Sequence, residues 1–442
     1  MKRALCVLLA VVLIVSMFSG CAGKPGPLRI CVDLEYIYGG DKISVIETYM
    51  YDLESSLMNN IGLSDYVIEY IPRTGSERSN AIDRIRTEIM SGGGPDVFIV
   101  NTAGGEWFTP SGEALFLQPE KAMEAGIFLP LDSYIENAQY AEWDKLTPEV
   151  MAGGKNREGQ QLVPLTYSVP TAIYLSSDFS HTPSRMTWSD MLNEKELFDT
   201  AARLGDARTM SGSFDFPADY ILGDLADYRQ ETLAFSEEDL LKRVNEVMEL
   251  TEYTTQNELY EVPNWSESSI GVGFNTSEGG YRYSEVINGI GEEDTYSLVP
   301  LYSDDGGCTA MVLSFAAVNR NTQRPQDAFA VIDCLLSTSK QMNAKLYTDL
   351  LYRRGVNASM PMHEEIMTEE KRVYAGLYPL SEENFTTLSA VRDQITNVQF
   401  AGQLNIELQN MMLECYDAHR FGEGYTDIVH RAYETMDRIL GE

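Results

Sequence analysis

The sequence predicts an α/β fold built around a parallel, doubly wound sheet. Patterns typical of strands at 28–34, 66–71 and 96–100 alternate with patterns typical of helices at 44–60 and 77–90. Strands that alternate with helices in this way form parallel sheets covered by helices. The nearly continuous apolar run at 96–100 supports the prediction, because strands buried on both faces have this composition.

The other elements follow from their own residues. Helix 77–90 has Ile82, Ile85 and Ile89 on one side, and a run of serine, glycine and proline ends it. Further along, we expect strands within 159–174 and at 309–318, and helices at 188–203, 236–253 and 325–336. The last third of the chain has a largely helical pattern.

The first 21 residues have the three parts of an export signal. A basic start precedes an apolar run over 4–18 and small residues before Cys21. That run is shorter than the roughly 20 residues of a membrane-spanning helix. The end of the signal resembles a bacterial lipobox, with Phe18 in place of the usual leucine. We therefore expect residues 1–20 to be removed, Cys21 to be lipidated and 21–27 to form a linker; an ordinary signal with a chance cysteine is the alternative.

Charge excludes several classes of partner. The chain has 33 Lys and Arg against 67 Asp and Glu, a formal net charge of −34. Nucleic acids and anionic membrane surfaces require a basic face, so neither is an expected partner. The 25 tyrosines instead offer flat, amphipathic rings beside many carboxylates. The cysteines are widely scattered, so we expect no metal site. The sequence leaves open whether two of Cys31, Cys308, Cys334 and Cys415 form a disulfide.

Most catalytic devices are missing from the sequence. There are only four histidines, and neither a G-x-S-x-G elbow nor a phosphate-binding loop occurs. His363 and Glu364 begin an H-E-x-x-H pattern, but Met367 takes the place of the second histidine. Paired carboxylates, which glycoside hydrolysis requires, stay open as an alternative. We therefore expect that the protein is not an enzyme and that it binds no cofactor.

Five segments, in the same order, resemble the extracellular solute-binding proteins of ABC importers, in particular their carbohydrate-binding group. They are IMSGGGPDVFIVN, IFLPLDSYIE, REGQQLVPLTYSVPTAIYLSSDF, MTWSDML and the long segment that starts with YSLVPLYSDDGG. The resemblance covers nearly the whole mature chain. Two departures concern the ligand, since YLSSDF replaces a segment that usually carries asparagine and 211–227 matches no sugar-binding pattern.

The resemblance implies a two-lobed fold of the periplasmic-binding-protein type II, with a solute held between α/β lobes that crossing strands join. We expect the first lobe at 28–166 and 267–320, and the second, helix-rich lobe at 168–263 and 322–442. Solute binding would close the lobes by a hinge motion.

Candidate ligand contacts follow from strand ends and from the resemblance. They are Glu35, Tyr36, Asn101, Thr102, Trp107, Tyr167, Ser168, Trp265, Asn275 and Arg353. The first five follow strands whose carboxyl ends meet at the ligand-binding edge of a parallel sheet. The next four lie at or near the expected crossings, and Arg353 lies in a segment that resembles a family loop near the cleft. Packing within a lobe, or a solvated helix end, is the alternative for each.

Together these features predict a monomeric lipoprotein on the outer face of the bacterial cytoplasmic membrane. It would touch the membrane only through its lipid, bind a mono- or oligosaccharide and deliver it to an ABC permease. A cationic or peptide solute is the second choice. A surface-anchored glycoside-cleaving enzyme and a sensor or adhesin are the alternatives from other classes.

Overall fold

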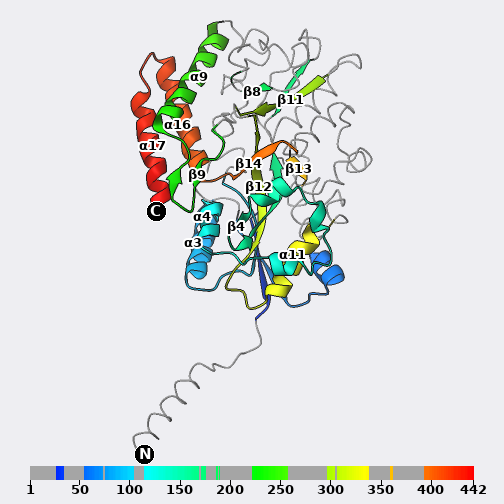
Figure 1. Cartoon of the computed structure of the whole chain (residues 1–442). Helices are drawn as coiled ribbons and strands as arrows, with labels where there is room; N and C mark the ends of the chain where they lie inside the picture. Colours follow the sequence, from blue (N-terminus) through cyan, green and yellow to red (C-terminus); the bar gives the residue numbers. More distant parts are fainter. Residues whose placement is uncertain are drawn as a thin grey trace, which may run out of the picture.

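The computed structural model describes residues 26–33, 54–72, 75–103, 114–168, 171–175, 186–187, 189, 222–256, 296–303, 306–337, 359–361 and 393–442. Within them are a large core around a mixed sheet and a smaller core among helices. The sheet occupies the lower part of Figure 1, and the helical core lies at its upper left.

Within the described residues, the large core surrounds a seven-stranded sheet. Its order is β13 (Ser359–Pro361), β6 (Leu162–Ser168), β12 (Cys308–Val318), β3 (Val97–Asn101), β1 (Leu28–Asp33) and β2 (Tyr66–Tyr70), with β14 (Ile395–Phe400) beside β12. β1 is parallel to both β2 and β3, as the strand–helix alternation predicts. β12 lies antiparallel between β3 and β6, β14 is parallel to β12, and β13 is antiparallel to β6. These three strands from late in the chain therefore run against the other four.

Helices cover this sheet on opposite sides, α3 (Gly75–Met90) on one and α11 (Pro325–Leu335) on the other (Figure 1). Residues 97–100 of β3 are fully buried, as their apolar run predicts. Ile82, Ile85 and Ile89 are the apolar residues that α3 places in the core. The shorter elements of this part are η1 (Leu57–Ile61), α4 (Pro119–Glu124), α5 (Asp132–Ile135), η2 (Trp143–Lys145), α6 (Pro148–Ala152), β4 (Lys155–Asn156) and β5 (Gly159–Gln160).

One buried carboxylate organises a loop of the large core. Asp333 of α11 is only 1% exposed and accepts backbone N–H bonds from Gln139, Tyr140 and Ala141 at 2.7, 3.0 and 3.0 Å. The indole N–H of Trp143 donates to the same carboxylate at 2.8 Å. Four donors therefore replace the water that this charge loses on burial.

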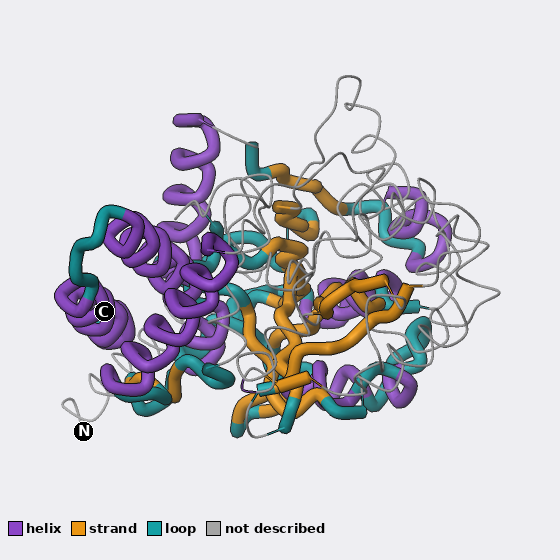
Figure 2. Tube along the Cα trace, turned by 90° about the horizontal axis from the view of Figure 1, so that it is seen from above, coloured by secondary structure: helices purple, strands orange, loops and turns teal. Residues whose placement is uncertain are grey.

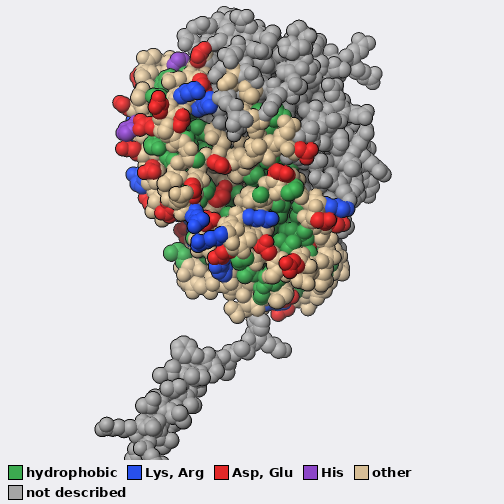
Figure 3. Space-filling view, in the orientation of Figure 1, with side chains coloured by type: hydrophobic (Ala, Val, Ile, Leu, Met, Phe, Trp, Pro, Cys, Tyr) green, Lys and Arg blue, Asp and Glu red, His purple; other side chains and the backbone are tan. Residues whose placement is uncertain are grey.

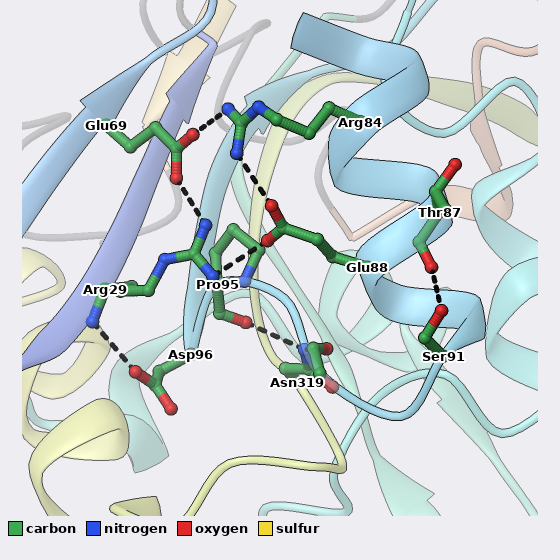
Figure 4. Close-up of polar contacts among 10 residues, drawn as sticks. Arg29, Glu69, Arg84, Thr87, Glu88, Ser91, Pro95, Asp96 and Asn319 are labelled. Atoms are coloured by element: carbon green, nitrogen blue, oxygen red, sulfur yellow. Dashed lines mark hydrogen bonds and ion pairs between the residues drawn. The ribbon is translucent and has the colours of Figure 1, made fainter. Parts of the chain in front are cut away.

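An ion-pair network joins β1, β2 and α3 (Figure 4). Arg29 contacts Glu69 and Glu88, each at 2.8 Å, and Arg84 contacts Glu88 at 2.8 Å and also Glu69. Beside it, the Asn319 amide donates to the carbonyl groups of residues 93 and 95 at 2.8 Å. These bonds fix the turn between α3 and β3 at the end of the sheet opposite to the carboxyl ends of the strands.

The smaller core is helical. It is formed mainly by α9 (Glu237–Gln256), α16 (Gln403–Arg420) and α17 (Thr426–Gly441), which lie side by side in Figures 1 and 2. Acidic side chains gather on the outer face of this group in Figure 3. Small strands β9 (Ala226–Asp227) and β10 (Thr232–Leu233) adjoin it. A separate sheet has β11 (Tyr296–Tyr302) between β7 (Thr171–Leu175) and β8 (Met186–Thr187).

The chain passes between the two sheets at positions that partly differ from the expected lobe boundaries. β6 and β7 belong to different sheets, so the chain leaves the large sheet after Ser168. β11 pairs with β7, so Tyr296–Tyr302 lies in the second sheet, whereas we expected 267–320 in the first lobe, and the chain returns to the large sheet between β11 and β12. Residue 265 lies outside the described residues. α11 packs in the large core, although we expected everything after residue 322 in the second lobe. Its apolar face contacts β3, β12 and η1, and a helical pattern alone does not specify such partners.

Cys31, Cys308, Cys334 and Cys415 are all buried, and none of the four forms a disulfide. Such buried cysteines act as small apolar residues, and Cys31 belongs to the large core. Within the described residues, no helix combines the length and apolar character that crossing a membrane requires.

Candidate functional site

The carboxyl ends of the central strands meet at one edge of the large sheet. Asp33 ends β1 and Asn101 ends β3, and the register pairs Asp33 with Val100. β6 runs parallel to β3, because both are antiparallel to β12, so Ser168 ends at the same edge. The chain leaves this edge for the second sheet, which makes it the side of the sheet that faces the rest of the molecule.

A buried ion pair fixes the end of β1. Arg78 of α3 donates to both carboxylate oxygens of Asp33, at 2.7 and 3.0 Å, and to the Pro72 carbonyl at 3.1 Å. Both charged side chains are 8% exposed. Such a bidentate pair holds the two elements in a defined orientation. Sequence patterns did not reveal this pair, and its only signal was an acidic residue at the end of an otherwise apolar strand.

Four candidate ligand contacts lie within the described residues, and they differ in what they offer a solute. Asn101 is half-buried at the end of β3. Thr102 is buried, and its hydroxyl donates to the Val312 carbonyl at 3.0 Å, so it joins β3 to β12. Tyr167, which we expected to contact the ligand, is fully buried in the large core. The backbone of Ser168 pairs with Met311 and Ser359. Of Asn101, Thr102 and Tyr167, Asn101 is thus the one that stays partly accessible.

The remaining predicted positions lie outside the described residues. They are Cys21, Glu35, Tyr36, Trp107, Trp265, Asn275 and Arg353.

A cavity of about 400 Å³ lies where the large core meets the helical one. We call it the junction pocket. It is lined by Glu120, Met123, Glu124, Asp224, Leu225, Ala226, Asp227, Tyr228, Arg229, Ala234, Val398, Gln399, Phe400 and Asn405. These residues come from α4, from the segment around β9, and from the end of β14 with the start of α16.

Glu120 is a half-buried acid of the junction pocket, and one of its carboxylate oxygens is inaccessible to solvent. Its other carboxylate oxygen accepts the Phe400 backbone N–H at 2.8 Å. Burial raises the pKa of Glu120 to about 7, and the nearby charge of Asp224 acts in the same direction. Burial also raises the pKa values of Asp224 and Tyr228. The sequence did not single out these residues, because one acid among 67 gives no sign of its burial.

Hydrogen bonds tie α4 and the residues before it to the helical core beside this pocket. Gln403 donates its backbone N–H to the Leu117 carbonyl at 2.8 Å, and the Gln118 amide donates to the Ile439 carbonyl at 3.2 Å. Lys121 donates to the Leu440 carbonyl and pairs with Glu231 at 3.4 Å. The junction pocket therefore lies at an interface where hydrogen bonds connect the two cores.

The comparison with protein families decides what kind of molecule this is. A model described as bacterial extracellular solute-binding protein matches residues 65–342. The chain belongs to this family. Its members bind small solutes outside the cell and work with ABC permeases. No curated protein matches the sequence.

Solved structures agree with the fold of this solute-binding protein. A family 1 extracellular solute-binding protein from Alicyclobacillus acidocaldarius is 14% identical, with a TM-score of 0.57 over 95% of this chain and 100% of that one. An oligogalacturonide-binding protein from Yersinia enterocolitica is 14% identical, with a TM-score of 0.57 over 94% and 98%.

A de novo designed cysteine esterase also aligns, at 15% identity and a TM-score of 0.59 over 95% of this chain and 99% of that one. Identities this low establish the fold alone, which is the expected two-lobed type II fold.

Proposed function

We propose that this solute-binding protein is an exported lipoprotein that captures a mono- or oligosaccharide between its lobes and delivers it to an ABC permease. The signal-like start and Cys21 supply the export and the anchor on the outer face of the cytoplasmic membrane. The protein catalyses no reaction in this proposal. A cationic or peptide solute is the second candidate, because a net charge of −34 favours cations.

The observation that carries the proposal is the edge formed by β1, β3 and β6 next to the crossings. An open edge at the carboxyl ends of parallel strands is where α/β proteins bind ligands. Asn101 offers an accessible side-chain amide there, and an amide can both donate to and accept from sugar hydroxyls. A protein of the same fold from Yersinia enterocolitica is described as oligogalacturonide-binding, and this supports the choice of a saccharide.

A thermal-shift screen tests the ligand class. The chain from Ala22 onward is heated with mono- and oligosaccharides, polyamines, amino acids and peptides, and a bound ligand raises the melting temperature by mass action. We expect a shift with at least one saccharide. A shift with a polyamine or peptide and with no saccharide would replace the sugar by the second candidate.

Two further measurements test whether the saccharide binds at this edge and whether it is released intact. Asn101→Ala should weaken the saccharide affinity roughly tenfold, the loss of about one hydrogen bond. Asn137→Ala removes an exposed asparagine in the turn after α5, whose side-chain amide donates to the Ser133 carbonyl, and should leave the affinity unchanged. Chromatography should recover every oligosaccharide intact, and shortened products would establish the glycoside-cleaving alternative instead.

A further inference from the structure

The chain passes from the large core to the helical core over residues 400–403, which we call the joint segment. β14 ends at Phe400, which is 1% exposed and packs its ring edge-on to that of Phe315 in the large core, at 5.6 Å between centroids. α16 begins at Gln403, and its buried apolar residues belong mainly to the helical core. The joint segment is therefore a covalent connection between the two cores.

Two hydrogen bonds hold the joint segment against α4 and the residues before it. Phe400 donates its backbone N–H to a carboxylate oxygen of Glu120 at 2.8 Å. Gln403 donates its backbone N–H to the Leu117 carbonyl, also at 2.8 Å. Because both partners precede or begin α4, a movement of the joint segment away from this helix breaks both bonds.

The joint segment also holds the end of β3. Ala103 donates its backbone N–H to the Ala401 carbonyl at 2.9 Å, and both residues are 3% exposed. Asn101 lies two residues before Ala103, and Thr102 between them is fixed by the bond of its hydroxyl to the Val312 carbonyl. Asn101 is thus followed directly by two residues whose hydrogen bonds are made to β12 and to the joint segment.

Close packing leaves the joint segment little freedom to shift. A Cβ atom added to Gly402 would lie 2.9 Å from the Leu117 carbonyl oxygen, which is shorter than an ordinary van der Waals contact. The backbone N–H of Gly402 donates to the side-chain oxygen of Asn405 at 2.8 Å. Ile406 of α16 is buried in one small cluster with Ala103. A displacement of the joint segment would therefore disturb the end of β3 as well as the start of α16.

We propose that Glu120 is a positioning residue of the solute site, which holds the end of β3 in place through the joint segment so that Asn101 is presented to a solute. This inference rests on the proposed function, because that proposal makes Asn101 a solute contact. Glu120 acts through Phe400 and Ala401 and does not itself touch the solute. A contact that is fixed before binding loses less conformational entropy when the solute arrives, so a firmly held joint segment raises the affinity.

A purely structural role of Glu120 predicts a different result. A residue that only stabilises the fold lowers the melting temperature when it is replaced, yet the molecules that remain folded bind the solute with unchanged affinity. A positioning residue changes the affinity of the folded protein. Two substitutions of similar size separate the hydrogen bond from packing, because Glu120→Gln keeps an oxygen that accepts the Phe400 N–H and Glu120→Met has none.

Hydrogen–deuterium exchange of the purified protein, resolved to single residues, tests without any solute whether Glu120 holds the end of β3. We expect Glu120→Met to speed the exchange of the Phe400 and Ala103 amides roughly fivefold, the loss of about one hydrogen bond, and Glu120→Gln to restore the wild-type rates. The Asp96 amide, which donates to the Arg29 carbonyl at the opposite end of the sheet, is the internal control. Its exchange should be the same in all three proteins.

Calorimetry with the saccharide that gives the largest shift in the thermal screen tests the consequence for binding. We expect Glu120→Met and Gly402→Ala to weaken its affinity roughly fivefold, and Glu120→Gln to stay within about twofold of the wild type. Two matched controls should leave the affinity unchanged. Glu149→Met removes an exposed acid of α6, and Gly424→Ala adds a Cβ atom with nothing within 4 Å. Gly402→Ala also serves as the second variant if Glu120→Met does not fold.

Three outcomes would overturn the positioning role. Unchanged exchange of Ala103 in both Glu120→Met and Gly402→Ala would show that the joint segment does not hold β3. Equal effects of Glu120→Met and Glu120→Gln would exclude the hydrogen bond as the cause. Unchanged saccharide affinity in Glu120→Met, together with weaker binding by Asn101→Ala, would reject the positioning role and leave the proposed function intact. If no saccharide binds, the proposed function fails, and the exchange of Ala103 still decides whether Glu120 holds the end of β3.

Discussion

Two buried carboxylates show how the large core and the junction differ. Asp333 in the large core receives four hydrogen bonds, three from backbone N–H groups and one from the indole of Trp143. Glu120 at the junction receives one from the backbone of another segment, and its second oxygen is buried without a hydrogen-bond partner among the described residues. A saturated carboxylate holds a structure together, whereas an unsaturated one retains the capacity to bind a proton.

The largest effect should come from removing the saturated carboxylate. Asp333→Ala leaves three backbone N–H groups and an indole N–H without their acceptor, so we expect a loss of about 4 kcal/mol in the free energy of unfolding. Chemical denaturation followed by tryptophan fluorescence measures it. Asp327→Ala, on the same helix but with a side chain that is 44% exposed, is the control and should cost less than about 1 kcal/mol. Equal effects of the two substitutions would contradict the structural role of Asp333.

The unsaturated carboxylate should instead make stability depend on pH. The folded protein holds the Glu120 proton up to about pH 7, whereas an unfolded chain releases it near the ordinary value of 4.5. The folded state therefore binds more protons between these values, and its free energy of unfolding falls as pH rises from 4.5 to 7. The loss attributable to this group is about 3 kcal/mol. It levels off above pH 7.

The difference between the wild type and Glu120→Gln isolates this contribution from other groups. The variant lacks the titrating group, so it should lose less stability than the wild type over this range and be the more stable protein at pH 8. Denaturation curves at several pH values measure both proteins. Parallel pH profiles would show that Glu120 does not titrate in this range.

The smallest effect should come from the partly exposed network at the base of the sheet. Arg84 is 47% exposed, and Arg84→Ala removes its bonds to Glu69 and Glu88 while Arg29 still contacts both acids. We expect a cost of about 0.5–1 kcal/mol that shrinks at high salt. Arg431→Ala breaks a more exposed pair with Glu414 and should cost still less. Denaturation at low and high salt concentration ranks the two.

Local patterns predicted much of the fold but little of the site. The buried run of β3 and the apolar face of α3 occur where expected. A strand buried on both faces gives a continuous apolar run, and a helix buried on one face gives apolar residues at helical spacing. Asn101 also lies at the predicted edge. Thr102 and Tyr167 lie in the right segments, yet their side chains serve sheet pairing and the core. The position of a residue along a strand does not specify which segments its side chain will contact in the folded protein.

The sequence by itself determined the α/β class, the main helices and strands of the large core, and the resemblance to solute-binding proteins, because these depend on local periodicity and on short ordered motifs. The tertiary structure alone decided that α11 joins the large core and that β11 pairs with β7. It also decided that Glu120 and Asp333, chemically similar acids, have opposite surroundings. Such outcomes depend on contacts between segments far apart in the chain, and no local pattern encodes them.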